Sequence, residues 1–375
     1  MQGFRSGSWI QQFQYKSFSP SKLNRDWQFN DPDILIALDE ANRLLGELNA
    51  YSKIIPDVDF FIKMHVVKEA TESSRIEGTK TEFDEALMEE DEIDPEKRDD
   101  WKEVHNYTLA MNHSIDQLHQ LPLSMRLLRD THRILLADSR GMYKGPGEVR
   151  TSQNWIGGSS LKDAFFIPPH QDEVNDLLSD LEKFWHNDEL KIPELLKAAI
   201  GHYQFETIHP FLDGNGRVGR LLITLCLIDK KLLEKPVLYL SDFFSRNKGA
   251  YYDALTLVRH SHDIRHWLLF FLQGVIETAQ NARETFTQIM QLRDDCDAKI
   301  LELGRRAIKA RDLLLIMYSK PIMDLNTMAK LLDITHQSCS SLAKGLEELG
   351  ILAEITGYRR NRLYAFNPYL KIFKN

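Results

Sequence analysis

The stretch that decides the fold is His209-Pro-Phe-Leu-Asp-Gly-Asn-Gly-Arg-Val-Gly-Arg220, which lies between two strongly apolar segments. The segment before it repeats apolar residues at the i, i+3 and i+4 spacing that is typical of a buried helix face. The segment after it is equally apolar, from Leu221 to Ile228. We therefore expect a mainly α-helical protein in which a short loop joins two core helices.

This loop has the composition of an anion-binding turn. Gly214 and Gly216 allow a sharp turn and a close approach of backbone N–H groups to a ligand. A helix that starts near Arg217 would add the positive end of its dipole. Arg217 and Arg220, three residues apart, could both donate charge-assisted hydrogen bonds to phosphate oxygens. The pattern therefore predicts a phosphate-binding site.

Two further side chains in the loop favour catalysis. Asp213 offers one hard oxygen ligand, which suits Mg²⁺ shared with substrate phosphates. His209 has an ordinary pKa near ~6.5 and can accept a proton as a general base. Each residue alone is more often structural, but their joint occurrence within one turn favours transfer from a nucleotide to a hydroxyl.

The segment from His209 to Arg220 resembles the Fic family, whose signature is HxFx[DE]GNGRxxR. It matches this signature at every fixed position. The resemblance implies a Fic-type helical bundle with a short β-hairpin flap. It implies that His209 deprotonates a Ser, Thr or Tyr hydroxyl of a target protein, or of the chain itself. The hydroxyl would then attack the α-phosphate of ATP, which yields an AMP-modified protein and pyrophosphate.

The resemblance also assigns roles in binding ATP and Mg²⁺. Asp213 would hold the metal, and Asn215, with the loop amides of Gly214 and Gly216, would hold the phosphates. Arg217 and Arg220 would bind the β- and γ-phosphates. Family members that phosphorylate carry a Lys where Gly216 stands, so adenylylation is favoured here.

Two aromatic patches resemble other family features. Phe165, Phe166 and Ile167 resemble the flap on which a target segment is laid as an added strand. Tyr251 and Tyr252 resemble positions near the adenine, although an aromatic pair on a helix is more often part of a core.

The hexapeptide Ser73 to Gly78 resembles the family's inhibitory motif [ST]xxxE[GN]. It ends a helix expected over residues 57–78, since Gly78 suits the left-handed conformation just beyond a helix. A Glu77 carboxylate paired with Arg220 would occupy the guanidinium that the γ-phosphate needs. Ser73 could support this arrangement locally. The same glutamate could instead orient water for the removal of AMP, and the sequence leaves both roles open.

The C-terminal residues have the element order of a winged helix-turn-helix. We expect helices at 307–318, 325–332 and 336–349, followed by a hairpin with Gly357 at its middle. Residues 308–375 carry a net charge of +4, against −12 for the rest of the chain. DNA is therefore one expected partner, with docking or dimerisation as the alternatives. The residues expected to contact DNA are Gln337, Ser341, Lys344, Arg359, Arg360 and Arg362.

Composition limits the remaining possibilities. The chain has 375 residues, of which 43% are hydrophobic and 27% charged, with a net charge of −8. No apolar run approaches the ~18 residues of a membrane span, so we expect a soluble, cytoplasmic protein without a membrane partner. The expected domains are an N-terminal helical region (1–105), the catalytic core (106–282), a helical connector (283–305) and the winged module (306–375). We expect no functional motif in the first thirty residues. The resemblance also allows a homodimer.

The leading hypothesis is thus a protein adenylyltransferase restrained by Glu77. A rival from another class is a DNA-binding transcriptional regulator whose Fic domain senses a nucleotide. A third reading is an enzyme that removes AMP from proteins.

Overall fold

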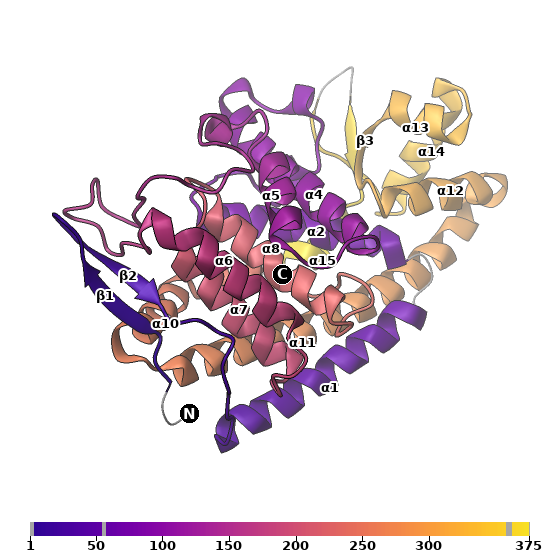
Figure 1. Ribbon diagram of the computed structural model, residues 1–375. Coiled ribbons are helices and arrows are strands. Elements are labelled where there is room, and N and C mark those ends of the chain that lie inside the picture. Colours follow the sequence, from indigo (N-terminus) through magenta and orange to yellow (C-terminus); the bar gives the residue numbers. More distant parts are fainter. Residues whose placement is uncertain (1–3, 55–57, 358–361, 375) are drawn as a thin grey trace.

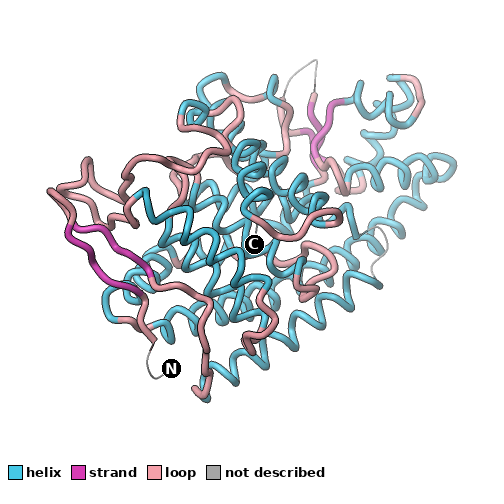
Figure 2. The backbone as a smooth tube through the Cα atoms, viewed as in Figure 1, coloured by secondary structure: helices cyan, strands magenta, loops and turns pink. Residues whose placement is uncertain are grey.

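The computed structural model describes residues 4–54, 58–357 and 362–374 and is mostly helical (Figure 1). The predicted mainly α fold is therefore confirmed. A strand pair lies at one side of the helical body, and the C-terminal module lies at the opposite side (Figures 1 and 2). Up to residue 143 the elements are β1 (Gly7–Gln11), β2 (Lys16–Pro20), α1 (Pro32–Ile54), α2 (Val58–Ile76), α3 (Phe83–Ala86), η1 (Glu90–Glu92), η2 (Pro95–Lys97), α4 (Arg98–Leu118), α5 (Met125–Leu135) and η3 (Arg140–Tyr143).

The second part of the chain supplies the core and the C-terminal module. Its elements are α6 (Gln171–His186), α7 (Glu194–Ile208), α8 (Asn215–Asp229), α9 (Ser241–Arg246), α10 (Lys248–Ser261), α11 (Ile264–Ile300), η4 (Leu301–Arg306), α12 (Ala307–Met317), β3 (Ile322–Asp324), α13 (Leu325–Leu332), α14 (His336–Glu348), β4 (Ala353–Glu354), β5 (Leu363–Ala365) and α15 (Asn367–Lys374).

Helices α7 and α8 form the centre of the molecule. Every residue of α7 from Leu195 to Ile208 is buried, because α6, α8 and α11 pack around it. Helix α2 packs against α4 and α9, and its C-terminal end reaches α8. The loop between α7 and α8 is thus fixed at both ends by buried helices, as expected from the two apolar segments.

The N-terminal residues form a hairpin that the sequence analysis did not predict. Strands β1 and β2 pair in antiparallel fashion, with Trp9 opposite Phe18. The expected flap strand, in contrast, is reduced to a single bridge between Ile156 and Phe166. Pro168 and Pro169 follow it directly and lack N–H donors, so the ladder cannot continue.

Helix α11 crosses the boundary expected between residues 282 and 283. It runs without interruption to Ile300, and the chain kinks only at Gly304, which has a φ of 56°. The residues predicted as a connector are therefore mainly the second half of one long helix.

The three C-terminal helices are confirmed to within a residue at their ends. Thr335 caps α14, since its side-chain oxygen accepts the Ser338 N–H at 3.2 Å. Strands β3, β5 and β4 form an antiparallel sheet in that order. Strand β3 and helix α15 were not predicted.

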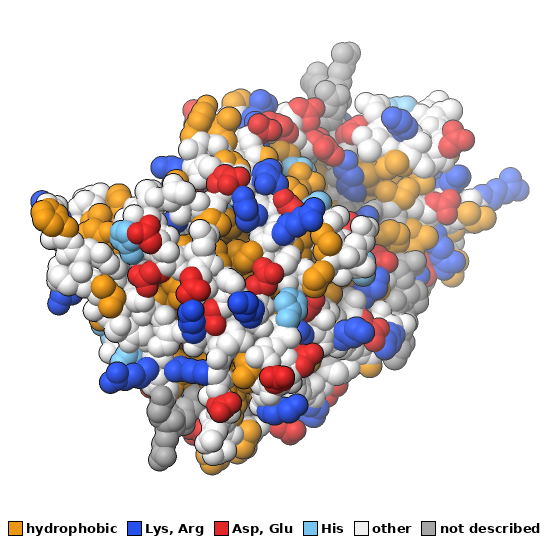
Figure 3. Space-filling view, in the orientation of Figure 1, with side chains coloured by type: hydrophobic (Ala, Val, Ile, Leu, Met, Phe, Trp, Pro, Cys, Tyr) orange, Lys and Arg blue, Asp and Glu red, His pale blue; other side chains and the backbone are white. Residues whose placement is uncertain are grey.

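In the part of the chain that the structure describes, no helix combines the length and the hydropathy that a bilayer span requires. Basic and acidic side chains are interspersed over the face shown in Figure 3.

Candidate active site

The loop from residue 209 to residue 214 is held closed by its own chain. His209 (φ 50°) ends α7 and Gly214 (φ 74°) precedes α8, both in the left-handed conformation. The Asn215 side chain accepts the Phe211 N–H and donates to the Phe211 carbonyl, each at 2.8 Å. The amide of Asn215 is therefore used within the loop. Its backbone N–H, at the start of α8, is available for the phosphate contact that was predicted.

Two buried residues outside the motif support this loop and were missed by sequence reasoning. Arg150 donates to the carbonyl of His209 at 3.0 Å and to that of Pro169 at 2.6 Å. Asn154 donates to the carbonyls of His209 and Phe211 at 3.1 and 2.9 Å. Both lie in a glycine-rich stretch without periodicity, so no sequence signal distinguished them.

His132, also missed, fixes the opposite end of the loop. Its Nδ1 accepts the Gly147 N–H at 2.8 Å, so Nε2 carries the proton and donates to the Asp213 carbonyl at 3.0 Å. Its ring stacks on Phe211 with a centroid distance of 3.9 Å. Burial lowers the pKa of His132 to about 4, which keeps this neutral tautomer at neutral pH.

A cavity of about 630 Å³ opens above the loop. This volume is within the usual range for a small-molecule site. The structure brings most of the predicted site residues into its lining: Glu77, Phe165, Phe166, His209, Asp213, Gly214, Asn215, Gly216, Arg220, Tyr251 and Tyr252. Arg217, Ser73 and Ile167 do not line it.

His209 presents a neutral imidazole to this cavity. Burial, followed by the positive charges of Arg259 and Arg150, lowers its pKa to about 3. Its Nδ1 has no hydrogen-bond partner among the described residues. A nearby triphosphate would raise this pKa, because negative charge favours the protonated imidazole. The group is thus suited to accept a proton once a nucleotide is bound.

Asp213 is the one loop carboxylate that could hold a metal. Its side chain is 43% exposed, and its Oδ1 accepts the Gly214 N–H at 2.6 Å. The described residues contain no group of three or more His, Cys, Asp or Glu side chains able to hold a metal ion. A single carboxylate still fits Mg²⁺, which takes its other ligands from water and phosphate oxygens.

Arg217 bonds to a carboxylate on another helix. Its guanidinium is buried and lies 3.3 Å from Oε2 of Glu103 on α4, and 3.8 Å from Oδ1 of Asp213. Glu103 also accepts hydrogen bonds from Thr79 and Arg140. A contact of Arg217 with phosphate would require it to leave this network, which three-residue spacing alone could not reveal.

Arg220 is paired as predicted with the end of α2. Its Nη2 donates to Oε1 of Glu77 at 2.6 Å and to the Ser73 carbonyl at 2.9 Å, and its Nε donates to Oγ of Ser73 at 2.8 Å. Burial alone would raise the pKa of Glu77, but Arg220 outweighs burial and the net pKa is lowered. Glu77 is therefore a carboxylate at neutral pH, held inside the cavity.

Gly216 leaves the space that Glu77 occupies. A Cβ atom at this position would lie 2.3 Å from Oε1 of Glu77 and 2.9 Å from Nη1 of Arg220. A side chain larger than hydrogen at position 216 would therefore collide with Glu77 in this arrangement.

The aromatic pair on α10 lines the cavity, but the two side chains differ in exposure. Tyr251 is buried, and its hydroxyl lies 2.8 Å from Nε2 of His202. Tyr252 is 41% exposed and can stack on a ligand. Glu206, a buried carboxyl not singled out by the sequence, lines the same cavity.

The flap differs from the prediction at its outer edge. Phe165 is 86% exposed at the cavity mouth, whereas Phe166 is buried under the Arg259 guanidinium, 4.0 Å from its ring centroid. The Ile167 carbonyl accepts the Phe18 N–H of β2 at 2.9 Å. The N-terminal hairpin therefore already lies on the edge where Ile167 was expected to receive an added strand.

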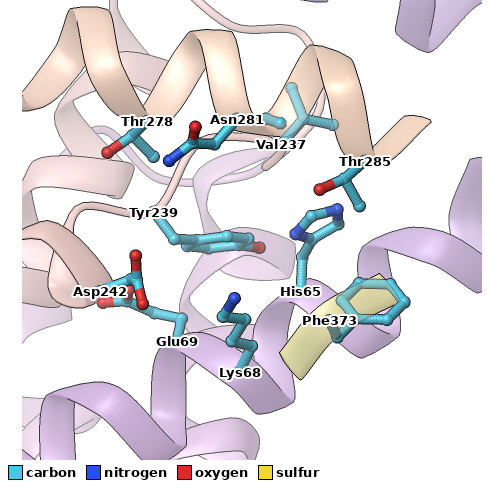
Figure 4. Close-up of a pocket in the computed structure, with 11 residues that line it drawn as sticks. His65, Lys68, Glu69, Val237, Tyr239, Asp242, Thr278, Asn281, Thr285 and Phe373 are labelled. Carbon is cyan, nitrogen blue, oxygen red and sulfur yellow. The ribbon is translucent and has the colours of Figure 1, made fainter. Parts of the chain in front are cut away.

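Another, smaller cavity of about 60 Å³ lies between α2, α11 and α15 (Figure 4). His65 and Lys68 of α2, Tyr239, and Phe373 of α15 surround it (Figure 4). None of the predicted site residues lines it.

Three of the residues predicted to contact DNA lie on an exposed face of α14. Gln337, Ser341 and Lys344 are exposed, although Ser341 accepts a hydrogen bond from Arg306 at 3.1 Å. Arg362 is exposed as well, whereas Arg359 and Arg360 lie outside the described residues.

Two family descriptions match this chain. Residues 35–116 match the Fic/DOC family N-terminal region, and residues 122–227 match the Fic/DOC family. The helical bundle and the loop site thus define a Fic-type protein. The chain belongs to the Fic/DOC family.

Relatives and solved structures agree with this assignment. The chain is 34% identical over 108 residues to protein adenylyltransferase fic-1 of Caenorhabditis elegans. This match covers 28% of this chain and 19% of the relative. It is 24% identical over 243 residues to protein adenylyltransferase Fic of Drosophila melanogaster. This second match covers 62% of this chain and 46% of the relative. The chain thus spans less than half the length of these relatives. A Fic family protein from Desulfovibrio desulfuricans has a similar fold, with a TM-score of 0.58 at 20% identity over 91% of this chain and 98% of that one.

Proposed function

We propose that the chain is a protein adenylyltransferase that transfers AMP from ATP to a Ser, Thr or Tyr hydroxyl. The observation that carries the proposal is one cavity lined by a neutral His209, by Arg220 and by the start of α8. The names of the relatives support the same reaction.

The chemistry follows from these groups. The target hydroxyl loses its proton to His209 while its oxygen forms a bond to the α-phosphorus of ATP. The bond between the α-phosphorus and the bridging oxygen breaks, and pyrophosphate leaves. The first N–H groups of α8 and Arg220 would stabilise the phosphates. Mg²⁺ at Asp213 would supply further neutralisation of phosphate charge. Tyr252 would contact the adenine, and Phe165 would contact the target segment.

Glu77 would act as a brake on this reaction. Its carboxylate holds the Arg220 guanidinium that a γ-phosphate needs, and it places negative charge beside the phosphate position. ATP could then bind only with its phosphates displaced.

The test compares AMP transfer by the wild type, Glu77→Gly, and Glu77→Gly combined with His209→Ala. With MgATP, intact-mass spectrometry should detect addition of AMP to protein for Glu77→Gly, at least 10-fold faster than for the wild type. The double variant should be inactive. Equal transfer by wild type and Glu77→Gly would refute the brake, and transfer that persists without His209 would refute the assignment of the base. Removal of AMP from a pre-modified target by the wild type alone would favour the reverse reaction.

DNA binding is a second candidate function, favoured by the exposed polar face of α14 and the positive charge of the module. Fluorescence anisotropy with a random-sequence duplex over a salt series tests it. Lys344→Ala should reduce the slope of log affinity against log salt by about 1. Lys371→Ala, an exposed lysine on α15, is the matched control. Absence of salt-dependent binding would favour a protein-docking role.

A further inference from the structure

Glu206 is a buried carboxyl group with an oxygen that no described residue contacts by a hydrogen bond. It lies on the last turn of α7, three residues before His209, and is only 7% exposed. It lines the cavity, and its Oε1 has no partner among the described residues. A buried carboxyl group left unpaired is destabilising, so its presence calls for an explanation.

The positive groups near Glu206 bond elsewhere. Arg220 donates to Ser73 and Glu77. Arg259 donates to Oγ1 of Thr207 at 3.2 Å and lies over the Phe166 ring. An ion pair with Arg220 or Arg259 therefore does not explain why the Glu206 carboxyl group is buried.

The backbone of α8 makes room for this carboxyl group. A Cβ atom at Gly219 would lie 2.0 Å from Oε1 of Glu206, so the side chain lies directly against the helix. Gly219 and Gly216, three residues apart, thus accommodate Glu206 and Glu77 respectively. Burial raises the pKa of Glu206 to about 7, so both protonation states are populated near neutral pH.

We propose that Glu206 accepts a hydrogen bond from the nucleoside of the bound ATP, either from a ribose hydroxyl or from the adenine amino group. This inference rests on the proposed function. Glu206 lines the same cavity as Arg220, at the phosphate end, and Tyr252, at the aromatic end. A nucleotide that spans these two residues brings its nucleoside past Glu206. Acidic side chains bind ribose hydroxyls in the same way in other nucleotide sites.

The experiment measures nucleotide binding by calorimetry at pH 8, where Glu206 is mainly ionised. The proteins are Glu77→Gly and Glu77→Gly/Glu206→Ala. The ligands are ATP, 2′-deoxy-ATP, 3′-deoxy-ATP and the triphosphate of purine riboside, which lacks the amino group. Glu206→Ala should weaken ATP binding at least 10-fold, the effect of losing a hydrogen bond to a charged group. The analogue that lacks the donor should bind both proteins equally, which identifies the donor.

Three results would overturn the proposal. One is an unchanged affinity for ATP in the Glu206→Ala protein, and another is an equal loss of affinity for all four nucleotides. The third is an effect of the same size from Asp253→Ala, an exposed carboxylate on the same cavity. Glu206→Gln, which keeps the shape and one acceptor, should lose less affinity than Glu206→Ala. If Glu77→Gly binds no nucleotide at all, the proposed function fails together with this inference.

Discussion

At the scale of single residues, the site contains two neighbouring carboxyl groups in different ionisation states. Glu77 has a lowered pKa because Arg220 outweighs its burial, whereas burial raises the pKa of Glu206 to about 7. The negative charge of Glu77 also contributes to the raised pKa of Glu206. The pKa values of the two carboxyl groups are therefore linked, and Arg220 influences both of them.

This difference predicts opposite dependences of stability on pH. Glu206 is protonated in the folded state until about pH 7, but in the unfolded state it loses its proton near pH 4.5. Its contribution to the free energy of unfolding therefore falls as the pH rises from about 4.5 to 7 and is constant above. Urea denaturation should show that Glu206→Gln gains stability over the wild type across this range. Glu77→Gln should differ most from the wild type above pH 4.5, with the difference shrinking at lower pH. Parallel profiles for all three proteins would contradict both assignments.

Ser73 offers a graded test of the brake. Ser73→Ala removes the acceptor of the Arg220 Nε–H in a buried position but leaves the backbone contact of Nη2. We expect a loss of stability of about 1–3 kcal/mol, because a buried donor is left unsatisfied. AMP transfer should rise above that of the wild type but stay below that of Glu77→Gly. Ser74→Ala is the control, at a neighbouring buried serine whose Oγ forms no hydrogen bond within the described part of the chain. Equal rates for Ser73→Ala and the wild type would place the restraint in Glu77 alone.

At the scale of elements, periodicity predicted the helices and the motif predicted the loop. Sequence reasoning failed where partners come from distant or aperiodic segments. Arg217 and Arg220 are three residues apart, yet they bond to Glu103 on α4 and to Glu77 in the turn just beyond α2. Neither the pairing with Glu103 nor the contact of β2 with the flap leaves a local pattern in the sequence.

The residues that hold the loop from 209 to 214 in place allow a prediction at this scale. Asn154→Ala removes both side-chain donors to the carbonyls of His209 and Phe211. Stability should fall by about 1–3 kcal/mol, measured by urea denaturation. In the Glu77→Gly background the rate of AMP transfer should fall at least 10-fold, since a displaced base loses its alignment with the hydroxyl. Nucleotide affinity should change much less, because Arg220 and α8 are untouched. Gln153→Ala, one residue earlier, should leave the rate unchanged. An unaltered rate for Asn154→Ala would mean that Arg150 alone positions the loop.

At the scale of the whole molecule, the C-terminal module packs on α2, the helix that ends just before Glu77. Phe373 of α15 contacts His65 of α2 edge to face, with ring centroids 5.1 Å apart (Figure 4). Tyr369 and Tyr318 contact Phe61 of α2 at 6.4 and 5.6 Å. Helix α2 is therefore fixed at one end by Arg220 and along its length by the C-terminal module.

This arrangement predicts that loosening α15 weakens the brake. Phe373 is 3% exposed, and Phe373→Ala should destabilise the docking of α15 by about 3 kcal/mol. Because α2 loses part of its packing, its amide hydrogens should exchange faster, and AMP transfer should exceed that of the wild type. Ile308→Ala, a 75% exposed side chain on α12, should change neither quantity. If α15 exchanges freely while exchange in α2 and the transfer rate stay at wild-type values, the module only covers the helix. If both respond, a ligand that pulls the module away from α2 would raise the rate of AMP transfer through the same contacts.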